Sequence, residues 1–265
     1  MNQDYTHITI ILDSSGSMTN IWDDTIGGFN AFLQGQKKTP GKLTLSQIHF
    51  SSHVHKGYKE LKAKNSVTQV NNWHANGMWT SLSKIDVNEK GMVSVPYAML
   101  NNFDEIESVK ELTRETFVPG GGTPLLDSIG IAIDETGESL SKLSENERPA
   151  KVLFVIITDG EENASRGYDY ADIESKITQQ TEKYNWLFSY LGANQDAIKA
   201  ASRFGISSSN SVNYNATAGS VSNTYDMFSS KVSTMRGMSA AAMCDTMAYT
   251  DEDRVKAVDE TVIKN

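Results

Sequence analysis

Three oxygen-bearing side chains alternate in a short loop near the start of the chain. Asp13, Ser15 and Ser17 follow the apolar run Ile8–Leu12, whose β-branched residues are typical of a buried strand. A loop turning over the carboxyl end of that strand would bring one carboxylate and two hydroxyls to one point. Such hard oxygen donors are the ligands that Mg²⁺ and Mn²⁺ prefer, and open α/β sheets bind ligands beyond the carboxyl ends of their strands.

Two other segments carry donors of the same kind, which are needed because one loop cannot fill six positions around Mg²⁺. Gly120–Gly122 leads into Thr123 and into a helical pattern that starts with Pro124. The apolar run Val152–Thr158 is a second buried-strand pattern, and it ends in Asp159. These segments add one hydroxyl and one carboxylate to the predicted site.

A pattern of five side chains follows, in chain order: Asp13, Ser15, Ser17, Thr123 and Asp159. In this pattern the chain resembles a von Willebrand factor A (vWA) domain with a metal-ion-dependent adhesion site (MIDAS). Residues 26–33, 158–165 and 191–197 resemble in particular the small soluble vWA proteins of bacteria and their phages.

The resemblance implies a role for each of the five side chains. Ser15, Ser17 and Thr123 would offer hydroxyl oxygens to a divalent cation, while Asp13 and Asp159 would bind it directly or through water. One position would stay open for an Asp or Glu carboxylate of a partner protein. Two carboxylates roughly neutralise Mg²⁺, so a third one gains Coulomb energy in a partly desolvated site. We expect Mg²⁺, with Mn²⁺ or Ca²⁺ as alternatives.

Some of these segments also have simpler interpretations. Ser15 and Ser17 could cap a helix, and Asp159 could lie in an ordinary turn. Gly120–Gly122 could cradle a phosphate. The segment lacks the Gly-Lys-Ser/Thr ending of a P-loop, however, which favours a flexible mount for Thr123.

Further residues are candidates for partner contact. Glu161 and Glu162 extend the acidity beside Asp159, and a solvated loop is the preferred interpretation over a second metal site. Trp73 and Trp79 are either contact residues, because aromatic residues are enriched at interface hot spots, or the core of a small subdomain. Glu161, Trp73 and Trp79 are therefore the predicted partner-binding residues.

Four histidines raise the question of a zinc site: His49, His53, His55 and His74. His53 and His55 would share one face of a strand. Neither a cysteine nor a further histidine lies at a useful spacing, so the surface of an edge strand is the preferred interpretation.

Apolar periodicity predicts the elements that carry the site. Strands are expected at residues 7–12, 43–50, 151–158, 186–191 and 211–214, and helices at residues 22–37, 124–143, 170–183, 196–204 and 218–236. Because strands alternate with helices, we expect an α/β fold with a doubly wound, mostly parallel sheet flanked by helices, Rossmann-like in architecture.

Residues 59–115 are more chain than a minimal vWA domain needs before its Gly-Gly-Thr loop. A structureless loop of this length is unusual in a compact domain, so we expect an insertion with its own hairpin or small subdomain. Residues 54–58 are predicted as a short edge strand, and residues 102–112 as a helix with Ile106, Val109 and Leu112 facing inward. The vWA domain is predicted over residues 1–236, and residues 237–265 as a tail that is helical or partly disordered.

Composition limits the classes of partner and the cellular compartment that the chain is expected to have. The 265 residues are 38% hydrophobic, and their net charge of −9 comes without the basic stripe that nucleic-acid binding needs. No segment approaches about 18 uninterrupted apolar residues, so no membrane span is expected. With one cysteine, Cys244, and no signal-peptide pattern in residues 1–7, we expect a cytoplasmic protein.

These features favour a non-enzymatic module that captures an acidic residue of a partner protein through its metal. One alternative is a metal-dependent phosphohydrolase with Asp13 as nucleophile. Such enzymes carry a second Asp two residues on, where this chain has Ser15, and no Lys or His follows either strand end for acid–base catalysis. The other alternative is a structural component of a larger assembly, in which the metal only stabilises the loops.

Overall fold

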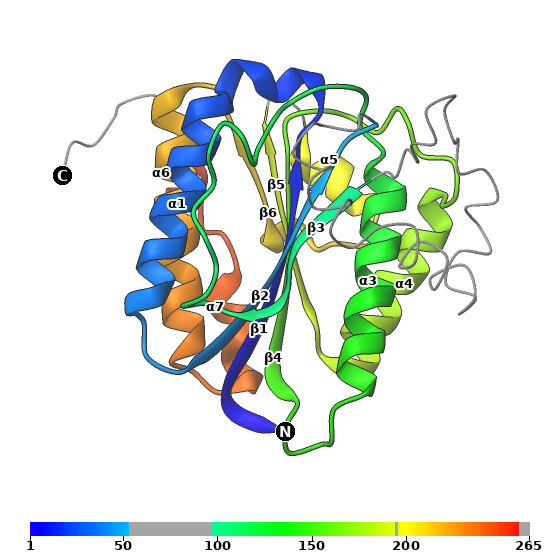
Figure 1. The fold of residues 1–265 in the computed structure, drawn as a ribbon, viewed down its shortest axis with the longest axis vertical. Helices are drawn as coiled ribbons and strands as arrows, with labels where there is room; N and C mark the ends of the chain where they lie inside the picture. The colour runs from blue at the N-terminus through cyan, green and yellow to red at the C-terminus, as the bar shows by residue number, and fades with distance from the viewer. Residues whose placement is uncertain (53–96, 194–195, 260–265) are drawn as a thin grey trace.

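A single sheet organises the part of the chain that the computed structural model describes, residues 1–52, 97–193 and 196–259 (Figure 1). Its strand order is β3-β2-β1-β4-β5-β6. Neighbouring strands are parallel except β2 and β3, which are antiparallel. The strands are β1 (Asn2–Asp13), β2 (Lys42–Phe50), β3 (Tyr97–Glu105), β4 (Pro149–Thr158), β5 (Leu187–Ala193) and β6 (Ser211–Tyr214).

Helices cover both faces of this sheet (Figure 1). One face carries α1 (Trp22–Lys38), α6 (Ala218–Arg236), α7 (Met243–Met247) and α8 (Asp251–Val258), and the other carries α3 (Leu125–Ser141), α4 (Tyr170–Tyr184) and α5 (Ala197–Ser202). Short 3-10 turns lie at η1 (Gly16–Ile21), η2 (Ser208–Asn210) and η3 (Ala240–Ala242). The predicted doubly wound, mostly parallel α/β fold is therefore confirmed.

β1 lies near the centre of the sheet, between β2 and β4, and its side chains are buried on both faces. Its alternation sends Ile8, Ile10 and Leu12 into the core under α1 and α6, and Ile11 into the core under α3. Leu12 pairs with Ile157 of β4. The loops that follow β1 and β4 therefore start at the same level, which positions their side chains next to one another at the carboxyl edge of the sheet.

The predicted helix over residues 102–112 is wrong. β3 runs to Glu105, and residues 106–112 form turns and coil alongside α1 (Figure 1). Ile106, Val109 and Leu112 are buried as predicted. Backbone groups of this segment form hydrogen bonds with side chains of α1, where a helix would pair them with one another. For example, Lys37 Nζ donates to Val109 O at 2.8 Å. Pairing with β2 and packing on α1 thus override the local helical pattern.

Other predictions for this stretch lie outside the described residues. They are the edge strand at residues 54–58 and the hairpin or subdomain between residues 59 and 96. The part of the predicted 59–115 insertion that the structure describes, β3 and the segment after it, belongs to the main sheet and core.

The chain after α6 returns to the edge of the sheet beside β6. The two terminal guanidinium nitrogens of Arg254 in α8 donate to backbone carbonyls before and in β6: Nη2 to Ser208 O and Nη1 to Ser211 O, each at 2.7 Å. Asn215 Nδ2 donates to Val258 O at 3.1 Å. The domain boundary at residue 236 stays a prediction. Within the described ranges no helix is both long and apolar enough to cross a bilayer.

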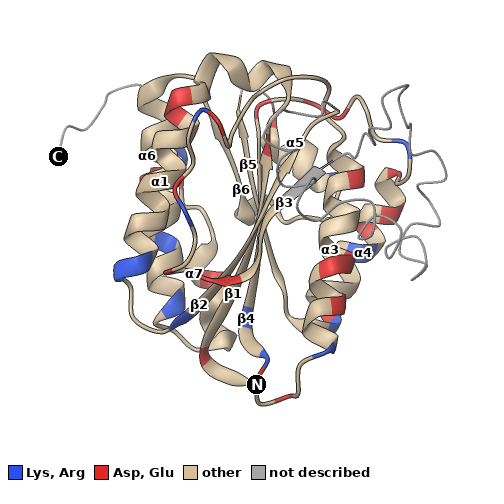
Figure 2. Cartoon of the chain, in the orientation of Figure 1, with Lys and Arg blue, Asp and Glu red and all other residues tan. Residues whose placement is uncertain are grey.

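Two buried cationic side chains, Lys151 and Arg236, lie at the opposite, amino edge of the sheet. Many other Lys and Arg residues lie toward this end of the molecule (Figure 2). Lys151 Nζ donates to Arg236 O and Met238 O, at 2.8 and 2.9 Å, and so caps the end of α6. Arg236 in turn donates to Gln36 O at 2.7 Å and to Gly41 O at 2.8 Å. It thereby satisfies carbonyls at the end of α1 and in the turn that follows.

Candidate metal-binding site

The loops after β1 and β4 meet through their side chains at the carboxyl edge. Ser17 Oγ donates to Asp159 Oδ1 at 2.6 Å. Ser15 Oγ and Ser17 Oγ lie 3.1 Å apart. Two hydroxyls from the first loop and a carboxylate from the second therefore form one continuous polar cluster.

Gly160 marks the point on which the remaining donors converge. A methyl group on its Cα would lie 3.3 Å from Thr123 Oγ1, 3.4 Å from Ser17 Oγ and 3.9 Å from Asp13 Oδ2. A side chain at position 160 would thus contact oxygens from two segments, the Gly-rich loop that carries Thr123 and the end of β1 with the loop that follows it. The structure brings all five predicted side chains together, although they span residues 13 to 159.

Asp13 is held from two sides beneath this cluster. Its Oδ1 accepts a hydrogen bond from Ser15 N at 2.7 Å, and its Oδ2 accepts one from Thr158 Oγ1 at 2.6 Å. The side chain is 0% exposed. Burial raises the pKa of Asp13 to about 6, and the charge of Asp159 acts in the same direction, while the two hydrogen bonds oppose the shift.

Asp159 completes a pair of carboxylates whose charge is poorly compensated. Burial raises its pKa as well, and the hydrogen bond from Ser17 acts against that increase. A divalent cation would favour the charged form of both Asp13 and Asp159, which burial disfavours. Within the described residues no three His, Cys, Asp or Glu side chains gather as a metal cluster. The donor set of two carboxylates and three hydroxyls fits a hard, oxygen-seeking ion.

The Gly-rich loop is held residue by residue by the loops around it. The contacts are Gly120 N to Ser14 O (2.9 Å), Gly16 N to Gly121 O (2.9 Å), Ser52 N to Gly122 O (3.0 Å) and Gly122 N to Ser52 Oγ (2.6 Å). Gly121 has a φ of 78°, a left-handed conformation that favours glycine. The N–H groups of Gly120 and Gly122 are thus used inside the protein, which favours the mount for Thr123 over the phosphate cradle.

The interpretation of Glu162 as part of a solvated loop is wrong. Its side chain is half-buried and accepts hydrogen bonds from Leu126 N (2.9 Å), Ala164 N (2.8 Å) and Ser165 N (2.7 Å). Glu162 therefore ties the loop after β4 to the first turn of α3. Glu161 is exposed, and its predicted contact with a partner stays a prediction, as do those of Trp73 and Trp79, which lie outside the described residues.

The interpretation of His49 as edge-strand surface is also wrong. β2 lies between β1 and β3, so His49 is fully buried. Its Nε2 lies 2.9 Å from Gln47 Nε2, and its ring meets Phe117 edge-on at 5.1 Å. His53, His55 and His74 lie outside the described residues.

Sequence reasoning overlooked three residues that shape the site. Thr158 anchors Asp13, Gly160 leaves the space on which the oxygens converge, and Asn163 binds the backbone of Thr123. Their one sequence signal is proximity to Asp159. The contacts themselves join residues 37 or more positions apart, which no local pattern reveals.

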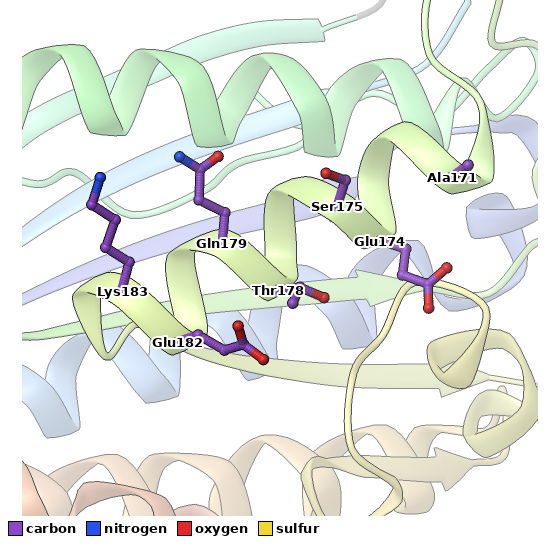
Figure 3. A pocket seen from close by; sticks show the side chains of 7 residues that line it. All are labelled: Ala171, Glu174, Ser175, Thr178, Gln179, Glu182 and Lys183. Atoms are coloured by element: carbon purple, nitrogen blue, oxygen red, sulfur yellow. The ribbon is translucent and has the colours of Figure 1, made fainter.

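A further concave surface lies on the outer side of α4 (Figure 3). Its lining comes from one stripe of that helix and mixes charges, as with Glu174, Glu182 and Lys183. The core-facing side of α4 carries Ile173 and Ile177. None of the five candidate oxygen donors lines this surface, which is the solvated face of an amphipathic helix.

Comparisons with known proteins address the fold. No protein-family model matches the sequence, and no curated protein matches it. A solved von Willebrand factor type A protein from Catenulispora acidiphila is similar with a TM-score of 0.47 and 11% identity, over 86% of this chain and 42% of that one. The pilus adhesin SpaC from Lactobacillus rhamnosus GG, in an open conformation, reaches a TM-score of 0.52 with 11% identity, over 88% of this chain and 31% of that one. The chain has a vWA-like fold.

The vWA resemblance noted in the sequence is thus confirmed at the level of fold. A third similar structure is proximal thread matrix protein 1 from the mussel byssus with a zinc-occupied MIDAS motif, at a TM-score of 0.46 and 12% identity, over 87% of this chain and 46% of that one. The chain spans less than half the length of each of these three proteins. At such identities the likeness concerns the vWA fold, and the chemistry must be argued from this chain's own residues.

Proposed function

We propose that the chain is a non-enzymatic protein-binding module that depends on a divalent cation. The observation that carries this proposal is the convergence of two poorly compensated carboxylates and three hydroxyls at the carboxyl edge of the sheet. Ser15, Ser17 and Thr123 would offer hydroxyl oxygens to the ion, and Asp13 and Asp159 would supply the charge that holds it. When bound, the cation would supply positive charge toward a ligand.

Mg²⁺ is the proposed ion, with Mn²⁺ and Ca²⁺ as alternatives. The set of donors consists entirely of oxygens, which hard cations prefer over the sulfur and nitrogen ligands of softer metals. Two carboxylates leave such an ion approximately neutral, so a further carboxylate from outside would still be attracted in a partly desolvated site. The proposed partner is a protein that presents an Asp or Glu side chain.

The burial of Asp13 argues against the alternative of a phosphohydrolase. A nucleophilic carboxylate must reach the phosphorus of its substrate. Both oxygens of Asp13 already accept hydrogen bonds from Ser15 N and Thr158 Oγ1, and the side chain is fully buried. We therefore assign Asp13 to ion binding. The single cysteine, Cys244, supports a cytoplasmic setting as part of the proposal.

Thermal unfolding in chelator and in millimolar Mg²⁺, Mn²⁺ or Ca²⁺ tests the metal. At about 100 times its dissociation constant the ion should add about 2.7 kcal/mol to the free energy of unfolding. Asp159→Ala should abolish that gain. Asp169→Ala, which removes an exposed N-cap carboxylate of α4, should keep it. Absence of a gain with every ion, or an equal gain in Asp159→Ala, would contradict the proposal.

A peptide array tests the partner. Each Asp- or Glu-containing peptide is paired with its Asn or Gln copy, and binding is measured in Mg²⁺ and in chelator. We expect binding that needs both the carboxylate and the metal. Turnover of a generic phosphatase substrate that disappears in Asp13→Asn would instead support the hydrolase. Metal-dependent stability with no carboxylate-dependent binding would support a purely structural role.

A further inference from the structure

The backbone of Thr123 is held on both sides by one residue of the loop after β4. Thr123 N donates to Asn163 Oδ1 at 2.8 Å, and Asn163 N donates to Thr123 O at 3.2 Å. A methyl group on the preceding Gly122 would lie only 2.8 Å from Asn163 Oδ1. Asn163 is therefore packed directly against the Gly-rich loop and fixes the peptide that carries the Thr123 hydroxyl.

The same loop is tied to the helix that follows Thr123. Glu162 Oε2 accepts from Leu126 N in the first turn of α3. In the other direction, the Asp127 carboxylate of α3 accepts from Gly167 N at 2.8 Å and from Tyr168 N at 2.9 Å. The loop after β4 and the start of α3 thus form one hydrogen-bonded unit, with Asn163 at the end nearest the candidate site.

Asn163 consequently links two candidate oxygen donors that come from different loops. It lies four residues after Asp159 and holds Thr123, which is 40 residues away in the chain. The distance between a carboxylate and a hydroxyl donor must be set within fractions of an ångström for a small cation. Residues that orient the ligands of a metal typically change its affinity about 10- to 100-fold when they are replaced.

We propose that Asn163 is a positioning residue of the metal site, which sets the placement of the Thr123 hydroxyl relative to Asp159. This inference rests on the proposed function. Asn163 acts through Thr123, because its Oδ1 is occupied by the N–H of that residue. The required property is an acceptor oxygen at this place. Asp at position 163 would retain that oxygen, whereas Leu, of similar size, would remove it.

Asn30 offers a matched control on the other face of the sheet. Its Oδ1 accepts from Leu112 N at 2.7 Å, and its Nδ2 donates to Leu112 O at 2.9 Å. It thus holds the backbone of a loop in the same way, but that backbone carries no candidate metal donor. Asn30→Leu therefore measures the general cost of losing such a contact.

The test is the dissociation constant of Mg²⁺ and of Mn²⁺, measured by calorimetry, with the Mn²⁺ electron paramagnetic resonance spectrum as a direct signature of the site. We expect Asn163→Leu to weaken binding about tenfold or more and to change the Mn²⁺ spectrum. Asn163→Asp should bind at least as tightly as the wild type. Asn30→Leu should lower the melting temperature in chelator and leave the affinity unchanged.

Two results would overturn the inference while the proposed function stands: wild-type affinity in Asn163→Leu, or an equal loss of affinity in Asn30→Leu. Failure of the wild type to bind either ion would overturn the proposed function and the inference with it. If Asn163→Leu does not fold, Asn163→Ala replaces it, because this variant removes the acceptor without adding bulk next to Gly122.

Discussion

Both edges of the sheet bury charge, but the charges have opposite signs and different partners. At the amino edge, Lys151 and Arg236 donate to backbone carbonyls at the ends of α6 and α1. At the carboxyl edge, Asp13 and Asp159 accept mainly from the hydroxyls of Thr158 and Ser17. Figure 1 shows these edges at opposite ends of the strands.

The difference separates a structural use of buried charge from the binding use that we propose. The carbonyls at the amino edge belong to helix ends and to the turns that follow them, so they cannot leave their cations without unfolding of those ends. The O–H groups at the carboxyl edge can rotate about their C–O bonds, so they can give up their hydrogen bonds to the carboxylates and turn oxygen lone pairs toward an ion. Burial raises the pKa of both carboxylates, which indicates that their negative charge is incompletely compensated by the protein alone.

The largest change in the free energy of unfolding is expected from a substitution at the amino edge. Arg236→Met should lower the free energy of unfolding by about 3–5 kcal/mol, equally in chelator and in Mg²⁺, because it leaves buried carbonyls without donors. Chemical denaturation in both buffers measures this. Lys151→Met should act in the same direction but less, since Lys151 Nζ donates to two carbonyls, whereas the guanidinium of Arg236 donates to four, those of Gln36, Thr39, Pro40 and Gly41. A metal-dependent loss in Arg236→Met would contradict the separation of the two edges.

At the carboxyl edge, removal of a buried charge should change the free energy of unfolding in the opposite direction. In chelator at pH 8, Asp13→Asn should stabilise the protein by about 1–3 kcal/mol. The pKa of Asp13 is raised to about 6 in the fold, so its ionised form opposes folding above that pH. In saturating Mg²⁺ the order should reverse, because the variant loses the gain from the ion. Denaturation of both proteins in both buffers is the measurement, and a destabilised variant in chelator would argue that the site is fully compensated without metal.

His7, on the same strand as Asp13, should titrate with the opposite sign. Burial lowers its pKa to about 3, and its ring nitrogens contact the hydroxyls of Thr44 and Thr9 at 2.9 and 3.1 Å. Between pH 6.5 and about 3 the unfolded state binds a proton that the folded state does not. Stability should therefore fall with falling pH, by up to about 1.4 kcal/mol per pH unit.

This pH dependence is measured by denaturation of the wild type and of His7→Gln in chelator. The variant should show a flatter decline below pH 6.5. An identical slope in the two proteins would mean that other groups dominate the acid response. Asp13→Asn, measured in parallel, should make the decline steeper, because Asp13 stabilises the metal-free fold as the pH falls from about 6.

The smallest effect on the fold is expected at Gly160. Gly160→Ala places a methyl group 3.3 Å from Thr123 Oγ1 and 3.4 Å from Ser17 Oγ. The Thr123 oxygen would have to shift by a few tenths of an ångström, and the Ser17 oxygen lies at the limit of ordinary contact. We expect little change of stability in chelator and about tenfold weaker binding of Mg²⁺, equivalent to about 1.4 kcal/mol. Unchanged affinity, measured by calorimetry, would mean that the ion does not bind in the space beside Gly160.

Much of the fold, and the five side chains that meet in the candidate site, could be predicted from the sequence. Apolar runs such as residues 151–158 and the helical period of residues 218–236 are local signals, and the structure has both elements. The five oxygen donors were found because each stands at the end of an apolar run or before a helix, where open α/β sheets gather side chains. The prediction of a helix over residues 102–112 was wrong because β2 and α1, both distant in sequence, decide the conformation of this segment.

The sequence by itself determined which oxygens are available at the carboxyl edge, since strand ends and their side chains follow from local pattern. Only the tertiary structure decided what holds these oxygens. The contacts of Thr158 with Asp13, of Asn163 with Thr123 and of Arg236 with the end of α1 join residues 40 to 200 positions apart. Such partners are selected by packing and by the need to satisfy buried polar groups, and both exist only once the chain is folded.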